Sequence, residues 1–347
     1  MAAVSASAAE DPLRELATSG YARTWHRLRR NRVAVCSGIV ILVIVAACFI
    51  GEPMAERLLG HGPNDVFPYG ADLSRKPVGP WTHVPKLETT LPVTAKTPRT
   101  LFILGGDGPL GRDEFLRILA GGRTSLEIAL GATALAILLG TILGAAAGFY
   151  GGFLDSVISR LTEFVMGFPI LFLIVALGLS TFTNHINSVT LYGAFVPGAL
   201  ALIVVIGIFN WFYLARIVRA QVLSLREQQF VEAARMIGAR DIHILRNHIL
   251  PHLVDTLIVY GSLIVATTIM LEAALSVLNI GVVIPYATWG NLIATNWGTL
   301  LVPSGQTGTY QTTVWTTTWP TVALFITVFA FALFAEGLRN ALDPYSS

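Results

Sequence analysis

The chain has 347 residues, of which 54% are hydrophobic and only 13% are charged. A soluble domain usually carries about a quarter charged residues, so this composition indicates that lipid is the solvent for much of the chain. The net charge is only +2, and no dense basic stripe with interleaved aromatic residues is evident, which argues against a nucleic-acid partner.

Apolar runs long enough to cross a membrane, which takes about 20 mostly apolar residues, recur along the chain. There are six of them, at 33–50, 125–150, 161–180, 192–215, 253–280 and 318–338. We therefore predict an all-α polytopic membrane protein with six transmembrane helices. The segments are an N-terminal segment 1–32, the first span, a long loop 51–124, a core 125–338 with a charged loop at about 216–252, and a tail 339–347.

Arginine residues indicate the sides of the membrane. Short cytoplasmic loops carry an excess of Lys and Arg, whereas long translocated loops do not follow this rule. The excess lies before the first span and between the fourth and fifth, in Arg14, Arg23, Arg27, Arg29, Arg30 and Arg32, and in Arg216, Arg219, Arg226, Arg235, Arg240 and Arg246. We expect both termini and the loop at 216–252 to be cytoplasmic. The loop at 51–124 then forms an irregular extracytoplasmic cap.

The first span contains both cysteines of the chain, Cys36 and Cys48. Their spacing corresponds to about 18 Å along a helix, which is too far for a disulfide. We expect both side chains to face lipid or to pack against neighbouring helices.

Small residues recur at every fourth position of the second span, at Gly140, Gly144 and Gly148. This spacing lets two helix backbones approach closely. Packing within the chain is a better explanation than a dimer-specific interface.

Acidic residues are rare in the spans, and Glu272 lies deepest. An ionisable residue inside the membrane calls for a functional hypothesis. We expect Glu272 either to belong to a polar network inside the bundle or to line a wet cavity. The chain of carboxylates that a proton-coupled carrier would need is missing.

A second outer stretch, at 284–317, is rich in Trp and Thr. Tryptophan favours the membrane interface, so this stretch is predicted there, and it is long enough to dip into a translocation path.

A charged island at 232–251 lies between the fourth and fifth spans. Ser224 and Glu227 form a capping-box pattern, which predicts a helix beginning at about Leu225. Its apolar face is expected to contain Phe230, Ala233, Ala234 and Ile237.

Three residues predict how the island continues. Gly238 favours the end of the first helix, Asp241 is a candidate cap for a second short helix, and Pro251 disfavours helical geometry at Leu250. The result is a helix–glycine turn–helix with a small apolar face and a charged rim. We interpret it as a docking element, one side of which can also pack on the chain's own spans.

The island resembles the EAA loop of ABC-importer permeases. The residues that carry this resemblance are Glu232, Ala233, Ala234, Gly238, Leu250 and Pro251. His248 gives the HILP form that is typical of the dipeptide/oligopeptide/nickel branch.

Further matches extend the resemblance over nearly the whole chain, to the second, C-type permease subunit of that branch. They are the lead-in at 25–32, the segments 105–113 and 122–126, Phe153-Leu154-Asp155, Phe168-Pro169, Trp289-Gly290-Asn291 and Leu342-Asp343-Pro344.

The resemblance implies the type I ABC-importer permease fold in a prokaryotic cell membrane. It implies a heterodimer with a second homologous permease, two ATPase subunits that bind ATP and Mg, and an extracytoplasmic peptide-binding protein. This chain would itself hold no cofactor and perform no catalysis. The substrates expected are di- and oligopeptides, with nickel chelates and some sugars as alternatives.

The same resemblance assigns residues to roles. The EAA loop, with His248, would contact an ATPase subunit. A candidate extracytoplasmic gate or scoop comprises Asp107, Gly111, Arg112, Asp113, Trp289, Gly290 and Asn291.

Other classes of function have weaker support. An ion-coupled secondary carrier predicts inverted repeats and intramembrane ionisable pairs, and neither is clear. A membrane-embedded enzyme lacks a catalytic constellation. The glycines at 106–111 lack the context of a nucleotide loop. His243, His248 and His252 have no carboxylate or cysteine to complete a metal site, so we expect none.

Overall fold

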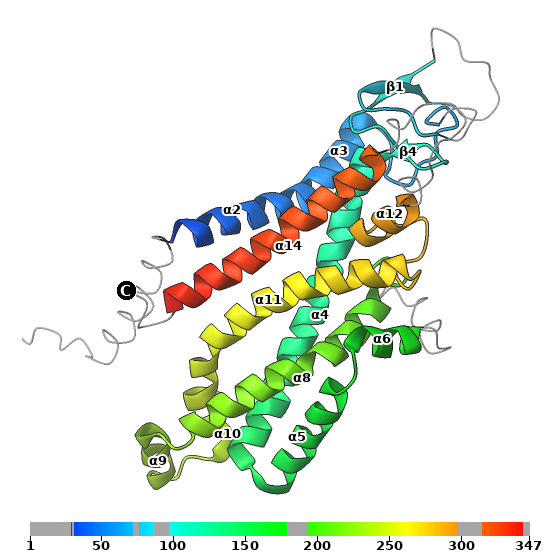
Figure 1. Ribbon diagram of the computed structural model, residues 1–347. Coiled ribbons are helices and arrows are strands. Elements are labelled where there is room, and N and C mark those ends of the chain that lie inside the picture. The colour runs from blue at the N-terminus through cyan, green and yellow to red at the C-terminus, as the bar shows by residue number, and fades with distance from the viewer. Residues whose placement is uncertain are drawn as a thin grey trace, which may run out of the picture.

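The computed structural model describes residues 29, 31–71, 76–86, 97–178, 193, 195–297 and 314–342. Figure 1 shows a bundle of long helices with a small group of strands at one end and the helix α9 at the other. Most of the segment 1–32, the end of the third expected span, the start of the fourth, the loop at 301–313 and the tail from 343 lie outside the described residues.

Five described segments are long and apolar enough to span a membrane. They are Arg32–Leu59, Glu114–Tyr150, Ala199–Leu225, Asp241–Val277 and Trp315–Leu342. They comprise the helices α2 (Arg32–Ala46), η1 (Ala47–Gly51), α3 (Glu52–Leu59), α4 (Glu114–Tyr150), α8 (Ala199–Leu225), α10 (Asp241–Ile244), η2 (Leu245–Ile249), α11 (Leu250–Val277) and α14 (Trp315–Leu342). The number of spans becomes six, as predicted from the sequence, when one bent helix pair is counted as a span.

The bent pair replaces the single helix predicted at 161–180. The helices α5 (Gly152–Met166) and α6 (Ile170–Gly178) meet at 88° across a short break. Pro169 lies in this break, where it lacks an N–H and disfavours helical geometry at Phe168. The prediction of one uninterrupted helix was therefore wrong.

The outer loop is shorter than the predicted 51–124, because helices extend into it from both sides. The first span continues to Leu59 and ends at Gly60, which has a left-handed φ of 68°. The second begins at Glu114, because the Asp113 carboxylate accepts the main-chain N–H of Phe115 at 2.9 Å and caps the helix.

The glycine repeat of α4 packs against α8, which confirms packing within the chain. A methyl group at Gly144 would lie 2.5 Å from the carbonyl oxygen of Ala215, and one at Gly148 would lie 2.8 Å from that of Arg219. The two helices therefore approach as closely as glycine permits.

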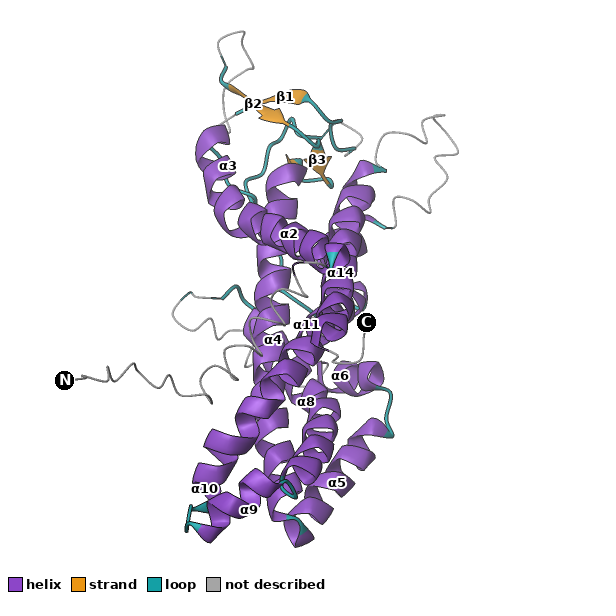
Figure 2. Ribbon diagram, turned by 90° about the vertical axis from the view of Figure 1, so that its left-hand side faces the viewer, coloured by secondary structure: helices purple, strands orange, loops and turns teal. Residues whose placement is uncertain are grey.

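The outer cap contains strands that the all-α prediction did not include. β1 (Thr82–Pro85) pairs with β2 (Arg99–Phe102), and β3 (Gly106–Asp107) pairs with β4 (Arg112–Asp113), both antiparallel. The rings of Phe67 and Phe102 pack edge to face, with centroids 5.2 Å apart, in the small core of this cap. Figure 2 shows the strands beyond the C-terminal end of α3 and the N-terminal end of α4.

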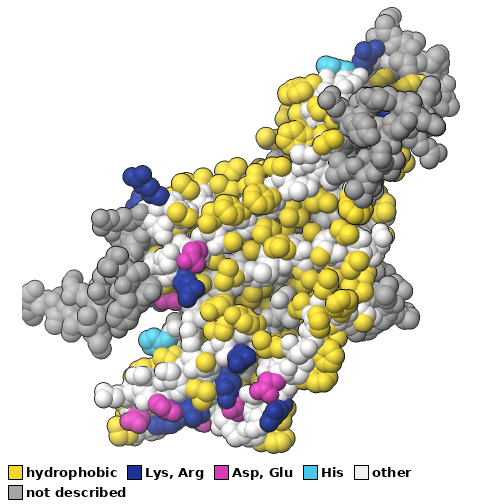
Figure 3. Space-filling model, viewed as in Figure 1, with side chains coloured by type: hydrophobic (Ala, Val, Ile, Leu, Met, Phe, Trp, Pro, Cys, Tyr) yellow, Lys and Arg dark blue, Asp and Glu magenta, His cyan; other side chains and the backbone are white. Residues whose placement is uncertain are grey.

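The surface of the bundle is divided between apolar and charged regions. In Figure 3, hydrophobic side chains cover the middle of the molecule, and charged ones gather over α9, α10 and the nearby ends of α5 and α8. Leu42 of α2 is 69% exposed and Phe325 of α14 is 63% exposed. Such a belt is stable only in contact with lipid or with another apolar chain. Cys36 and Cys48 are both free, as expected.

Candidate functional site

The segment 229–252, which is predicted to contact an ATPase and which we call the coupling element, lies at the charged end of the bundle (Figure 1). It consists of α9 (Gln229–Met236), a turn at Gly238, α10, η2 and the start of α11. Its inner side chains form one apolar cluster with α4, α8 and α11. They are Val231, Ala234, Ile244 and Ile249, packed on Val218, Val222 and Leu253. Each buried aliphatic side chain contributes about 1.5–3 kcal/mol, so the base of the element is firmly held.

The tip of the coupling element is apolar but exposed. Met236 is 82% exposed, Ile237 86% and Ile242 64%. Gly238 joins the helices with a φ of +78°, and no heavy atom lies within 4 Å of the position its Cβ would take. Glu232 is also exposed. The tip therefore exposes apolar side chains with charged residues around them, and none of the described residues covers it.

The predicted faces of α9 were only partly right. Of the four residues expected on its apolar face, Ala234 is buried, whereas Ala233 and Ile237 are exposed and Phe230 is at the limit, with 36% exposed. Val231, fully buried, was missed, because the face was aligned to Phe230 and not to the residue after it.

The capping-box prediction was wrong. α8 continues through Leu225, since the N–H of Arg226 still bonds to the carbonyl of Val222, and α9 begins only at Gln229 without a side-chain cap. Asp241 is the first residue of α10 and not its cap. The glycine turn after α9 is confirmed.

Pro251 does not break the helix at Leu250 as predicted. The five residues of η2 form a wide π-turn in which the N–H of Leu250 bonds to the carbonyl of Leu245. Pro251 then lies in the first turn of α11, where its missing N–H is tolerated. α10, η2 and α11 are consequently continuous from Asp241 to Val277.

Two arginines, one just before the coupling element and one in it, contact the end of α4. Arg226 donates to the carbonyls of Gly148 at 2.9 Å and Phe149 at 3.4 Å, which completes the C-terminal end of α4. The guanidinium of Arg235 on α9 lies 5.6 Å from the ring centroid of Phe149. α9 is therefore in direct contact with α4 through Arg235 and packs on α8 through Val231 and Ala234.

The histidines of the coupling element contact other side chains. The rings of His243 and His248 lie 5.8 Å apart, and that of His252 packs 5.4 Å from Phe230. Within the part of the chain that the structure describes, no group of three metal-ligating side chains gathers.

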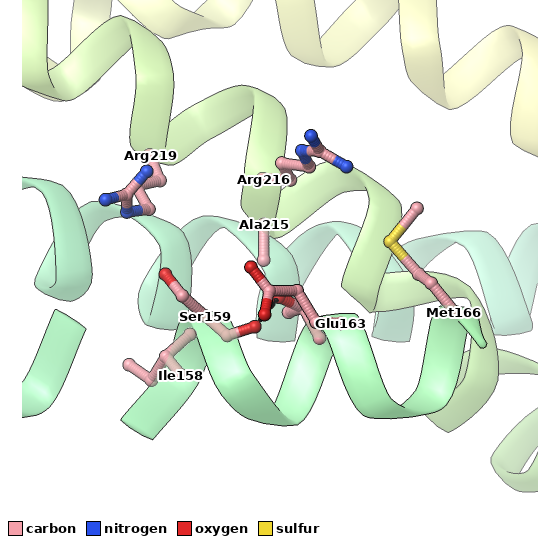
Figure 4. Close-up of a pocket in the computed structure, with 8 residues that line it drawn as sticks. Ile158, Ser159, Glu163, Met166, Ala215, Arg216 and Arg219 are labelled. Carbon is pink, nitrogen blue, oxygen red and sulfur yellow. Dashed lines mark hydrogen bonds between the residues drawn. The ribbon is translucent and has the colours of Figure 1, made fainter. Parts of the chain in front are cut away.

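Cavities formed by described residues open near the charged end. One of about 130 Å³ lies between α5 and α8; Figure 4 shows Arg216 and Arg219 of α8 opposite Ser159 and Glu163 of α5. Another of about 410 Å³ lies between α11 and the end of α14, where Asp255 and Arg339 are among its lining residues. Both are lined by charges of either sign, so neither selects one sign of ligand.

The residues of the hairpin β3–β4 that were predicted to form a gate surround a buried carboxylate. Asp107 is 1% exposed and pairs with Arg117 Nε at 2.5 Å and Arg112 Nη2 at 3.4 Å. Its other oxygen accepts the Nδ2–H of Asn296 at 2.8 Å. Gly111 turns the hairpin with a φ of +61° and lies against Gly70. Arg117 and Asn296 were missed from the sequence, because Arg117 follows the motif on α4 outside its pattern and Asn296 is distant in sequence.

Asp113 has two structural roles. One oxygen caps α4, and the other lies 3.0 Å from Nε2 of His61. The His61 ring packs against Phe67 in the core of the cap. Asp113 therefore anchors the cap to the second span.

The other predicted gate residues lie in α12 (Trp289–Asn296). Thr288 and Asn291 form a capping box at its start. The buried Trp289 donates its indole N–H to the carbonyl of Ile118 at 3.0 Å. A Cβ on Gly290 would lie 2.6 Å from Cα of Ala273, so α12 packs directly on α11. Asp107 and Trp289 are thus linked through opposite ends of one short helix.

Glu272 belongs to a polar network inside the bundle, which is the first of the two alternatives expected from the sequence. It is fully buried, and its oxygens accept the hydroxyls of Ser276 at 2.9 Å and Ser125 at 3.3 Å. The Thr288 hydroxyl also faces it. Ser125 in turn accepts the main-chain N–H of Trp289 at 3.2 Å. The network joins α4, α11 and α12.

A family model described as the binding-protein-dependent transport system inner membrane component matches residues 119–345. The chain belongs to this family. A second model, the N-terminal TM domain of oligopeptide transport permease C, matches residues 20–77. The resemblance to C-type permeases of ABC importers is thereby confirmed, and with it the type I importer permease fold.

Curated relatives of this permease cover most of its length. The glutathione transport system permease protein of Pectobacterium atrosepticum is 31% identical over 320 residues, 92% of this chain and 89% of the relative. The oligopeptide transport system permease protein of Haemophilus influenzae is 34% identical over 239 residues, 69% of each chain. The dipeptide transport system permease protein of Bacillus subtilis is 29% identical over 320 residues, 92% of this chain and 84% of the relative.

A solved structure is also similar to this permease. It shows inward-facing conformations of the MetNI methionine ABC transporter, with a TM-score of 0.48 and 18% identity, and the match covers 65% of this chain and 96% of that chain.

Proposed function

We propose that this permease is one half of a heterodimeric, ATP-driven importer of di- and oligopeptides. A binding protein delivers the peptide outside, and two separate ATPase subunits, which bind ATP and Mg, supply the energy inside. The observation that carries the proposal is the exposed apolar tip of the coupling element, formed by Met236, Ile237 and Ile242 around Gly238. Exposed apolar side chains on a firmly packed base indicate a docking surface for another protein.

The charges favour placing this tip in the cytoplasm. Arg226, Arg235, Arg240 and Arg246 lie on or beside it, and a short cytoplasmic loop carries such an excess. Both termini would then be cytoplasmic as well, and the cap of β1–β4 would face the binding protein outside.

The peptide substrate is supported by the names of the relatives, which transport oligopeptides, dipeptides and glutathione. A nickel chelate or a sugar is the alternative that the transport assay separates. An ion-coupled carrier has less support, because the buried carboxylate of Glu272 is engaged by hydroxyl groups of Ser125 and Ser276.

Reconstitution tests the proposal. The permease, its partner permease, both ATPases and the binding protein would be placed in proteoliposomes, and uptake of a labelled peptide measured with and without ATP. We expect uptake to require ATP and to persist when ionophores collapse ion gradients. Uptake that collapses with the gradient, or that occurs for a sugar and not for peptides, contradicts the proposal.

A matched pair of glycine variants tests the coupling element. Gly238→Val strains a left-handed residue at the tip, whereas Gly152→Val strains another at the turn between α4 and α5, and both positions are open. We expect Gly238→Val to abolish ATP-driven uptake while membrane insertion continues, and Gly152→Val to retain more uptake. Equal uptake in the two variants contradicts the docking role.

A further inference from the structure

One continuous helix connects the coupling element to the outer side of the permease. From Asp241 to Val277 it contains 37 residues, which corresponds to about 55 Å. The π-turn η2 keeps it unbroken past Pro251. Glu272 lies near the far end of this helix, so the second half of the coupling element, from Asp241, and Glu272 belong to the same helix.

At that far end, Glu272 holds the start of α12 through Ser125. The chain of hydrogen bonds runs from the Trp289 N–H to the Ser125 hydroxyl at 3.2 Å, and from that hydroxyl to the Glu272 carboxylate at 3.3 Å. Ser276 donates to the other oxygen. All these side chains are buried or nearly so.

The close packing around these hydrogen bonds leaves α12 little freedom to slide along α11. Gly290 allows α12 to lie against Ala273 and Ser276 of α11, since any Cβ there would lie within 3.0 Å of both. At the other end of α12, Asn296 donates to Asp107 of the outer hairpin. α12 therefore bridges α11 and the cap.

A buried carboxylate is tolerated only while its hydrogen bonds are made. If α12 moved away from α11, Ser125 would lose its N–H partner, the capping Thr288 would leave the carboxylate, and Glu272 would keep fewer donors. The buried carboxyl group thus favours the arrangement in which α11 and α12 stay together.

We propose that Glu272 is a positioning residue that fixes α12 to α11, so that a displacement of the coupling element is carried along α11 and moves α12 as part of the outer gate. The proposal rests on the proposed function for its source of motion, because an ATPase must displace the coupling element.

Distances between spin labels test the link directly. With Cys36→Ser and Cys48→Ala removing the native thiols, labels would be placed at Met270→Cys on α11 and Trp297→Cys just after α12, both exposed. The full complex in nanodiscs would be measured without nucleotide and with ATP and vanadate. We expect one narrow distance, unchanged by nucleotide, in the parent and a broadened or shifted one in Glu272→Ala.

A conservative variant distinguishes a role of the Glu272 hydrogen bonds from a role of its side-chain volume. Glu272→Gln keeps an amide oxygen that accepts from Ser276, and its NH2 group can donate to the hydroxyl oxygen of Ser125, so it should restore the narrow distance. Ser125→Ala, which removes only the bridging hydroxyl, should broaden it even if Glu272→Ala fails to assemble. A parent distance that changes with nucleotide, or a narrow distance in both Glu272→Ala and Ser125→Ala, overturns the proposal.

Transport supplies a second readout. We expect Glu272→Ala to lower uptake about tenfold relative to ATP hydrolysed, a coupling loss typical of residues between two sites, and Glu272→Gln to recover most of it. Glu163→Ala, which removes an exposed acid of α5, is the control and should leave this ratio unchanged. Normal coupling in Glu272→Ala contradicts the proposal. If the parent imports no peptide at all, the proposed function is wrong, and the label distances still decide the role of Glu272.

Discussion

Arg219 of α8 and Asp155 of α5 are joined by two hydrogen bonds, one of which, from Nη2 to Oδ2, is 2.7 Å long. Their side chains are 33% and 20% exposed, so the pair is partly shielded from water. It fixes the first half of the bent pair α5–α6 to the helix that leads into the coupling element.

Breaking this pair should destabilise the permease. We expect Asp155→Asn to lower the free energy of unfolding by about 1–2 kcal/mol, because a charge-assisted, two-point contact is lost. Thermal unfolding of the purified chain in detergent measures the change. Glu163→Gln, which breaks the far more exposed pair with Arg160, should change stability by less than about 0.5 kcal/mol. Equal shifts in the two variants would show that burial of the pair has no role.

The close contact of α4 with α8 should not tolerate larger residues. We expect Gly144→Val to destabilise the chain by about 1–3 kcal/mol or to prevent assembly, because its side chain would overlap Ala215 and Val218. Gly51→Ala is the control, since the nearest atom to its Cβ is 3.8 Å away. The melting temperature and the yield of folded protein report the difference, and a well-folded Gly144→Val contradicts the packing.

Inside and outside positions of the coupling element should respond differently to a charge. Ile244→Asp places an unpaired carboxylate in the fully buried cluster and should cost about 4 kcal/mol or more. Ile237→Asp, at a side chain that is 86% exposed, should leave the melting temperature unchanged and abolish copurification with the ATPase. Retained ATPase binding in Ile237→Asp would contradict docking through the tip.

The anchor of the outer cap predicts a local effect. Asp113→Ala removes the cap of α4 and the contact with His61, and should cost about 1–2 kcal/mol. Asp113→Asn keeps an oxygen for the cap and should lose less. Hydrogen exchange at the N–H groups of Phe115 and Leu116 measures the change, and protection in Asp113→Ala equal to that of the parent would show that the cap does not depend on this side chain.

The sequence predicted those features that depend on local chemistry. Gly238 was assigned as a helix end, and the structure gives it a left-handed φ. The repeat at 140, 144 and 148 was assigned to packing inside the chain, because small residues on one helix face need a neighbouring backbone.

Predictions failed where a longer element overrode a local signal. Ser224 and Glu227 have the spacing of a capping box, yet α8 continues past them. Pro251 signals a break, yet a π-turn absorbs it. The partners of Asp107 were beyond prediction for another reason: Arg117 and Asn296 meet it only through the fold.

The wide turn η2 also determines which way each face of α11 points about the helix axis. One residue more or fewer there rotates a helix by about 100° about its own axis. A single deletion within 245–249 would turn Glu272 away from Ser125 without altering a side chain at either end. The length of this five-residue turn is therefore as specific a part of the permease as any of its charged groups.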